Sequence, residues 1–337
     1  MKISWKQYEL TLKHTFRISR SASDTVKVMI VELEHDGIVG YGEASPTKRY
    51  GESVETIAAF LGKIDLSRYE SPLMLEDILN AVEALAPGNT SAKCAIDLAL
   101  HDWVGKKLNI PLYQLWGLNP AKSPLSSFTI AIDTKEVVEQ KVHEAEEFPI
   151  LKVKVGSDND EEMINTIRKL TDKVLYVDAN EGWKDKNLAL KRVQWLKDQN
   201  VGFIEQPMPA AQLDDIKWLR EKSDIPLIAD ESVLRLREIP QLASAFDGIN
   251  IKLMKCTGLR EAMRMINTAR ALNLKVMMGC MIETAVGISA GAHIAPLLDY
   301  ADLDGNVLIS NDPFDGVRNT KGKLTLTNKP GLGVTLR

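Results

Sequence analysis

The chain has 337 residues, 45% of them hydrophobic and 26% charged, as in folded globular proteins and unlike disordered or fibrous ones. The formal charge is −4 and no dense basic run is present, so we expect no nucleic-acid partner. No apolar run reaches the roughly 18 residues that span a bilayer, and the first residues lack a signal-peptide core. We therefore expect no membrane contact and a cytoplasmic location, which three widely spaced cysteines also favour.

The first third of the chain predicts a small α+β unit. Residues 2–12 and 26–42 alternate in polarity and are rich in β-branched and aromatic types, and a turn-forming Asp36-Gly37 pair lies within the second run. Three helical patterns follow, at residues 53–64, 75–85 and 90–108. This order of elements predicts an antiparallel meander followed by helices.

From residue 128 onward, short apolar strands alternate with amphipathic helices. Because parallel strands need a helical return crossing, this rhythm predicts a parallel sheet, and eight strands favour a closed barrel. The predicted strands lie at residues 128–133, 150–156, 174–180, 202–207, 226–232, 248–255, 275–283 and 300–306.

Charged side chains follow the carboxyl ends of most of these strands. In a parallel barrel these ends share one mouth, where active sites lie, so we expect the charged residues to form one pocket. They are Lys152, Lys154, Asp178, Glu205, Asp230, Lys252, Asp302 and Asp304.

Three carboxylates on consecutive strands predict a metal site. A single Asp after a strand is most often a cap or turn residue, but Glu205 belongs to an apolar strand, where an unpaired carboxylate is costly. The all-oxygen set of Asp178, Glu205 and Asp230 favours one Mg²⁺ per subunit. Ca²⁺ is the alternative, although it usually recruits more protein oxygens, and Zn²⁺ is not expected because no His or Cys joins the set.

The lysines indicate acid–base chemistry. Lys152 and Lys154 share one strand face, where repulsion predicts a lowered pKa for at least one of them, and Lys252 lies half a barrel away. A cation on a substrate carboxylate would stabilise an enediolate, and a lysine on each face of the α-carbon would invert the centre. The alternatives are solvated strand ends or a single Schiff-base lysine.

The chain resembles the enolase superfamily, specifically its muconate-lactonizing-enzyme subgroup, whose sites pair a lysine base with Mg²⁺. The resemblance implies a modified TIM barrel of (β/α)7β type over residues 123–311 and an α+β capping domain over residues 1–122, with the tail 312–337 packing back on the cap. The matching segments are Lys152-Val153-Lys154, Asp178-Ala179-Asn180, Glu205-Gln206-Pro207, Asp230-Glu231-Ser232 and Asn250-Ile251-Lys252.

The resemblance also implies a role for each site residue. Asp178, Glu205 and Asp230 would be Mg²⁺ ligands. Lys154 and Lys252 would be the acid–base catalysts, and Lys152 would steady the substrate carboxylate and depress the pKa of Lys154. Thr129, Lys152, Cys280, Ile282, Asp302 and Asp304 would line the substrate site.

Asp302 and Asp304 narrow the reaction within this subgroup. They share one strand face and suit a substrate ammonium, although an ordinary Asp-Gly turn is the alternative. In context this Asp-x-Asp resembles the motif with which dipeptide epimerases hold the α-ammonium of the first residue. The implied reaction is epimerisation of the second residue of a dipeptide. The runner-up reactions, N-acylamino acid racemisation and o-succinylbenzoate synthesis, use substrates without that ammonium, and a non-catalytic metal-dependent binding protein is the alternative of another class.

L-Ala-L-Glu and L-Ala-D-Glu from murein peptides are the first candidates for the dipeptide. Arg17 or Arg20, in the first capping loop, could pair with a glutamate side chain, whereas an exposed basic loop is the alternative. Hydrophobic or cationic dipeptides remain open, although Lys13 and Lys48 nearby make cationic ones less attractive. We also expect a homo-oligomer.

Overall fold

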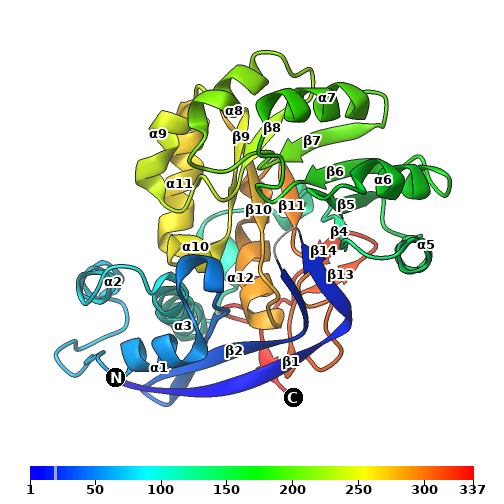
Figure 1. Cartoon of the computed structure of the whole chain (residues 1–337). Coiled ribbons are helices and arrows are strands. Elements are labelled where there is room, and N and C mark those ends of the chain that lie inside the picture. Colours follow the sequence, from blue (N-terminus) through cyan, green and yellow to red (C-terminus); the bar gives the residue numbers. More distant parts are fainter. Residues whose placement is uncertain (19–20) are drawn as a thin grey trace.

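Two sheets organise the molecule, an antiparallel sheet of three strands and a parallel sheet of eight (Figure 1). The computed structural model describes residues 1–18 and 21–337. None of the helices it describes has the length and apolar character needed to cross a membrane. Homo-oligomerisation and the cytoplasmic location stay predictions.

The antiparallel sheet consists of β1 (Lys2–Ile18), β2 (Ser21–His35) and β3 (Ile38–Ala44). Asp36 and Gly37 join β2 to β3 with positive φ angles of 53° and 71°, as the predicted tight turn requires. One face of the sheet packs on α1 (Val54–Leu61), α2 (Leu75–Ala84) and α3 (Thr90–Leu108).

Close approach of α3 to β3 depends on glycine. A Cβ atom at Gly42 would lie 1.8 Å from the carbonyl oxygen of Ala95, so only glycine admits the helix backbone here. Helix α3 is buried from Ser91 to Gly105 because its other side meets α11 and the short helix α10.

The parallel sheet runs in chain order, and its two edge strands meet. Ser127 N, just before the first strand, donates a hydrogen bond of 3.0 Å to the carbonyl of Ala301 in the last strand, which completes the barrel. This confirms the predicted capped barrel and all eight strand positions. The strands are β4 (Phe128–Ile130), β5 (Ile150–Lys154), β6 (Val174–Asp178), β7 (Val201–Glu205), β8 (Leu227–Ala229), β9 (Gly248–Ile251), β10 (Lys275–Gly279) and β11 (Tyr300–Asp302).

Helices connect successive strands and cover the barrel (Figure 1). At the middle of four strands, the side chains of Tyr176, Phe203, Ile228 and Met277 form one apolar cluster inside the barrel. The connecting helices are α5 (Lys135–Glu144), α6 (Asp160–Arg168), α7 (Lys186–Leu196), α8 (Leu213–Arg220), α9 (Ile239–Leu242), α10 (Leu253–Cys256), α11 (Leu259–Ala271) and α12 (Ala285–Ile294).

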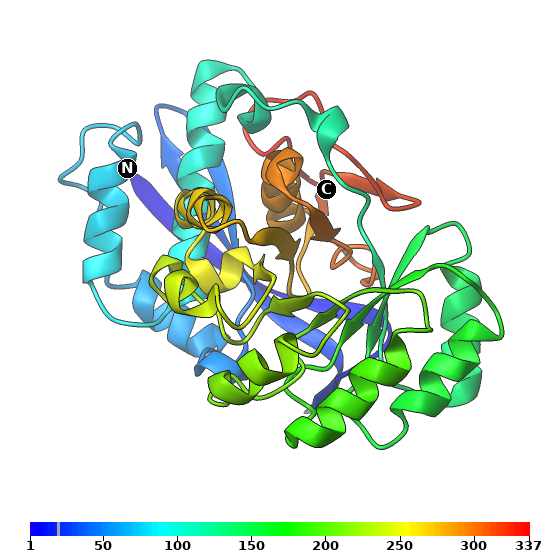
Figure 2. The ribbon, with the colours of Figure 1, turned by 90° about the horizontal axis from the view of Figure 1, so that it is seen from above.

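The hairpin of β1 and β2 reaches from the capping helices to the barrel, as the view from above shows (Figure 2). Lys13 N donates to the carbonyl of Leu308 at 2.9 Å, and Ile132 N donates to the carbonyl of Arg17 at 3.1 Å. These bonds join β1 to the loops that follow β11 and β4. The hairpin therefore contributes to the wall of the barrel mouth.

The C-terminal tail contacts both parts of the molecule. Leu332 N donates to Asp102 of α3 at 2.7 Å, whereas Asp312 accepts from Ala285 N of α12 at 2.9 Å. The exact domain boundaries, at residues 122 and 311, stay a prediction. The tail strands are β12 (Phe314–Asp315), β13 (Arg318–Thr320), β14 (Lys323–Thr325) and β15 (Thr335–Leu336), and the remaining short helices are η1 (Lys48–Tyr50), α4 (Leu112–Leu115), η2 (Pro120–Lys122), η3 (Leu236–Glu238) and η4 (Ala295–Leu297).

Candidate active site

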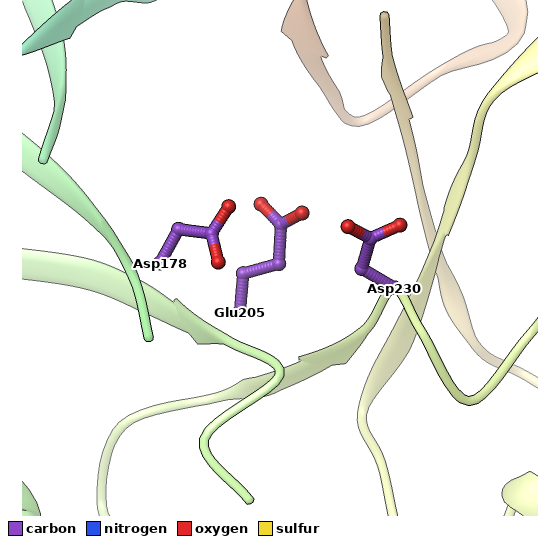
Figure 3. A group of neighbouring side chains, drawn as sticks. All are labelled: Asp178, Glu205 and Asp230. Carbon is purple, nitrogen blue, oxygen red and sulfur yellow. The ribbon is translucent and has the colours of Figure 1, made fainter. Parts of the chain in front are cut away.

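Three buried carboxylates meet at the carboxyl ends of neighbouring strands (Figure 3). Asp178 ends β6, Glu205 ends β7, and Asp230 follows β8. One oxygen from each lies within 4.8 Å of the others. An all-oxygen set at this spacing fits a hard divalent cation such as Mg²⁺. The structure thus brings together the three residues that the sequence assigned to a metal.

The three predicted lysines surround these carboxylates. Lys154, at the end of β5, lies 2.6 Å from Asp178, and Lys252, just after β9, lies 2.8 Å from Asp230. In the sheet order, β6, β7 and β8 lie between the strands of these two lysines. Lys154 and Lys252 therefore approach the three carboxylates from opposite sides.

Lys152 lies deeper, with only 1% of its surface exposed. Its Nζ is 2.7 Å from Glu205, 2.8 Å from Asp302 and 3.3 Å from Asp178. Burial alone would lower the pKa of Lys152, but these carboxylates raise it well above its usual value. The lowered pKa expected from repulsion is therefore not found at Lys152.

Burial raises the pKa of the three carboxylates, and the neighbouring lysines lower it. Burial favours the neutral acid, yet Lys154 and Lys152 lower the pKa of Asp178 to about 2. For Glu205, burial and the negative charge of Asp178 prevail and raise the pKa to about 7. Such a carboxylate is an incompletely neutralised buried group, which a cation would stabilise as its ionised form.

Two residues to which the sequence assigned no role hold the carboxylates in place. Lys255, in α10, is buried, pairs with Asp230 Oδ1 and donates 2.6 Å and 3.0 Å hydrogen bonds to the carbonyls of Asp230 and Val233. Asn250 donates to Glu205 Oε1 at 2.7 Å. A lysine within the otherwise apolar run after β9 was the available signal for Lys255.

Asp302 and Asp304 form a second acidic group at the closure of the barrel. Ser127 Oγ donates to Asp302 Oδ1 at 2.7 Å, and Thr129 N donates to Asp304 Oδ2 at 2.7 Å. Burial and the adjacent Asp302 raise the pKa of Asp304 to about 7. We call Thr129, Asp302 and Asp304 the amino-group pocket, because two buried carboxylates with one nearby lysine, Lys152, leave room for another positive charge.

A cavity of about 210 Å³ connects the two groups and is the active-site cavity below. Asp178 and Glu205 are fully buried and do not contribute to its wall. The wall contains the other predicted residues, namely Thr129, Lys152, Lys154, Asp230, Lys252, Cys280, Ile282, Asp302 and Asp304.

The capping residues in this wall differ from those expected. Phe16 and Ile18 line the active-site cavity, and because side chains alternate along β1, Arg17 faces away from it. Arg20 lies outside the described residues. Arg49 of η1, which was not among the predicted site residues, is the only arginine among the described residues of the wall. Its Nη2 pairs with Glu181 at 2.8 Å and 2.9 Å.

This capped barrel, with carboxylates between opposed lysines, defines the class of metal-assisted proton-transfer enzymes. Residues 4–117 match the N-terminal domain of mandelate racemase and muconate lactonizing enzyme, and residues 134–337 match the enolase C-terminal domain-like family. The chain belongs to this family.

Individual relatives cover nearly the whole chain. An L-Ala-D/L-Glu epimerase of Bacteroides thetaiotaomicron is 52% identical over 99% of this chain and 88% of its own length. A dipeptide epimerase of Enterococcus faecalis, solved with Mg and L-Leu-L-Tyr, is 32% identical with a TM-score of 0.91, over 99% and 98% of the two chains. An N-succinyl Arg/Lys racemase of Bacillus cereus is 31% identical with a TM-score of 0.92, over 100% and 96%.

Proposed function

We propose that this protein is a Mg²⁺-dependent dipeptide epimerase, an isomerase that inverts the α-carbon of the second residue. One observation carries the proposal: Lys154 and Lys252 face each other across the three carboxylates, and the amino-group pocket opens into the same cavity. The 52% identity to an L-Ala-D/L-Glu epimerase supports the same reaction.

Asp178, Glu205 and Asp230 would hold the metal ion. When bound, the ion supplies positive charge that stabilises the negative charge developing on the substrate carboxylate. A ligand that binds only the folded state raises the midpoint of thermal unfolding. We therefore expect Mg²⁺ to raise that midpoint in the wild type and Glu205→Gln to lose most of the shift. An equal shift in the variant would exclude Glu205 as a ligand.

Lys154 and Lys252 would move the proton. A base on one side removes the α-proton and the protonated lysine on the other side returns one to the opposite face, which inverts the centre. Burial lowers the pKa of Lys152, but the neighbouring carboxylates raise it by more. Lys152 therefore stays positively charged and would hold the substrate carboxylate. Phe16, Ile18 and Ile282 in the wall would exclude water from this step.

Arg49 would recognise an acidic side chain on the second residue. Both of its contacts with Glu181 use Nη2, and a guanidinium carries five N–H donors, so other donors can reach a substrate carboxylate. We expect Arg49→Met to lower kcat/KM for L-Ala-L-Glu about tenfold or more while changing that for L-Ala-L-Phe much less. Equal losses for both dipeptides would contradict this role.

Proton NMR in D₂O with Mg²⁺ tests the reaction itself. L-Ala-L-Glu, L-Ala-L-Phe and N-succinyl-L-Phe are compared, and deuterium should enter the α-position of the second residue of a dipeptide as its diastereomer appears. Exchange with N-succinyl-L-Phe alone would favour an N-acylamino acid racemase. The similarity to the N-succinyl Arg/Lys racemase supports this second candidate. No exchange with any of them would contradict the substrate class.

A further inference from the structure

A second cavity adjoins the amino-group pocket. It measures about 170 Å³ and lies between β1, β4 and the loop after β11. Leu12, Phe16, Thr129 and Leu308 line both this cavity and the active-site cavity, so the two share one wall. None of the chemistry described above uses the second cavity.

Thr129 fixes where a bound dipeptide would meet this cavity. Its backbone N holds Asp304 at 2.7 Å, and its side chain lies 3.5 Å from Asp302. An ammonium bound by these two aspartates is therefore next to Thr129. The side chain of the first residue branches from the same carbon as that ammonium, which places it beside the shared wall.

Apolar side chains provide most of the surface of this cavity. Phe128 and Phe148 pack with ring centroids 4.9 Å apart, and Ala131 and Val307 also line it. Apart from Thr129, the polar part of the lining consists of Lys13, His14, Thr15, Lys141 and Glu144. The cavity is similar in volume to apolar cavities of roughly 150 Å³ that admit a benzene ring. The second cavity is therefore large enough for a branched aliphatic or aromatic side chain.

The charged groups of this lining other than Lys13 are already paired. His14 lies 2.8 Å from Glu144, and Lys141 lies 3.2 Å from Asp133. A charged substrate side chain would have to compete with these pairs and would lose hydration in an apolar site. The lining thus favours uncharged, apolar side chains.

We propose that the second cavity is the subsite for the side chain of the first residue and takes apolar side chains larger than the methyl group of alanine. This inference rests on the proposed dipeptide epimerase function and extends it to the other residue of the substrate. Filling an apolar subsite changes specificity by about tenfold or more per added carbon group. We therefore expect kcat/KM for L-Leu-L-Glu to exceed that for L-Ala-L-Glu at least about tenfold.

The test compares L-Ala-L-Glu, L-Leu-L-Glu and L-Lys-L-Glu with the Mg²⁺-loaded enzyme, following inversion of the glutamate by NMR. Ala131→Leu fills the second cavity and should lower the ratio of kcat/KM for L-Leu-L-Glu over L-Ala-L-Glu about tenfold. The matched control Ala121→Leu makes the same change at an exposed position of η2 and should leave the ratio unchanged.

Val307→Phe provides a second way to fill the cavity at a partly exposed position, should Ala131→Leu fail to fold. The subsite is overturned if L-Leu-L-Glu is inverted no better than L-Ala-L-Glu, if L-Lys-L-Glu is preferred, or if neither filled variant changes the ratio. Inversion of L-Ala-L-Glu without that of L-Leu-L-Glu would reject the subsite alone. Failure of every dipeptide would reject the proposed function and the subsite with it.

Discussion

Lys154 and Lys252 lie on opposite sides of the three carboxylates, so each can reach only one face of the α-carbon of a bound substrate. We expect Lys154→Ala and Lys252→Ala each to lower epimerisation by at least about 10²-fold, the usual contribution of an acid–base group. Each variant should still exchange the α-proton of one diastereomer, because the remaining lysine faces it. NMR in D₂O with both diastereomers measures this. If both variants exchanged the same diastereomer, the two-base arrangement would be wrong.

Asp304 provides the second test at a single residue. It is buried beside Asp302 and accepts a hydrogen bond from Thr129 N. A hydrogen bond between a charged group and a ligand contributes about 1.5–3 kcal/mol to binding. Asp304→Asn should therefore lower kcat/KM for L-Ala-L-Glu by roughly ten- to hundredfold, mainly through KM. The same variant should treat N-succinyl-L-Phe no worse than the wild type does, because that substrate has no ammonium. A parallel loss for both substrates would point to a structural role.

At the scale of elements, β3 and α12 are joined through a pair of buried glutamates. Glu43 of β3 accepts hydrogen bonds from Thr284 N at 2.8 Å and from Gly287 N at 2.9 Å, so it caps the start of α12. Glu283 accepts from Met281 N at 2.7 Å. A Cβ atom at Gly287 would lie 2.2 Å from Glu283 and 3.2 Å from Glu43, so both carboxyl groups meet above this glycine.

This pair predicts a loss of stability at alkaline pH. Burial raises the pKa of Glu43 to about 7, and burial together with Glu43 raises that of Glu283 to about 8. Both values exceed the ordinary value, so the protonated groups stabilise the fold fully at acid pH and this stabilisation is lost as pH rises through 7 and 8. The free energy of unfolding should fall by about 1–3 kcal/mol between pH 6 and 9.

Denaturant unfolding across this pH range measures the effect. Glu283→Gln mimics the protonated acid and should flatten the pH dependence, whereas Glu161→Gln, at an exposed position of α6, should leave it unchanged. A wild-type profile that is flat from pH 6 to 9, or an unaltered slope in Glu283→Gln, would exclude the pair as its source.

The elements and the charged strand ends were predictable because their signals are local. Asp178, Glu205 and Asp230 follow apolar strands one β–α unit apart, and the parallel barrel brings such positions to one mouth. The role of Arg49 was not predictable, since its partner Glu181 lies 132 residues away, in the turn after β6. The second cavity likewise depends on how β1 packs beside β4 and the loop after β11. The hydrophobic periodicity of the sequence does not predict such packing between distant elements.

At the scale of the whole molecule, α3 joins the capping sheet to the barrel. It is buried on all sides from Ser91 to Gly105, because the antiparallel sheet covers one side and α10 and α11 cover the other. Neither part can expose this helix without losing apolar burial. We therefore infer that the capping sheet and the barrel unfold together.

Asp97 tests that coupling, because it links α3 to the start of α11. Its carboxylate accepts hydrogen bonds from Leu259 N at 2.6 Å and Arg260 N at 3.2 Å, groups that have no partner within their own helix. Asp97→Ala should cost about 1–2 kcal/mol, as for other lost helix caps, and should lower the midpoint of one calorimetric transition. Asp77→Ala, at an exposed position of α2, is the control and should shift the midpoint little. If Asp97→Ala instead split the transition into two, the capping sheet and barrel would be independent folding units joined mainly by this contact, and closure of the active-site cavity would depend on their docking rather than on their common core.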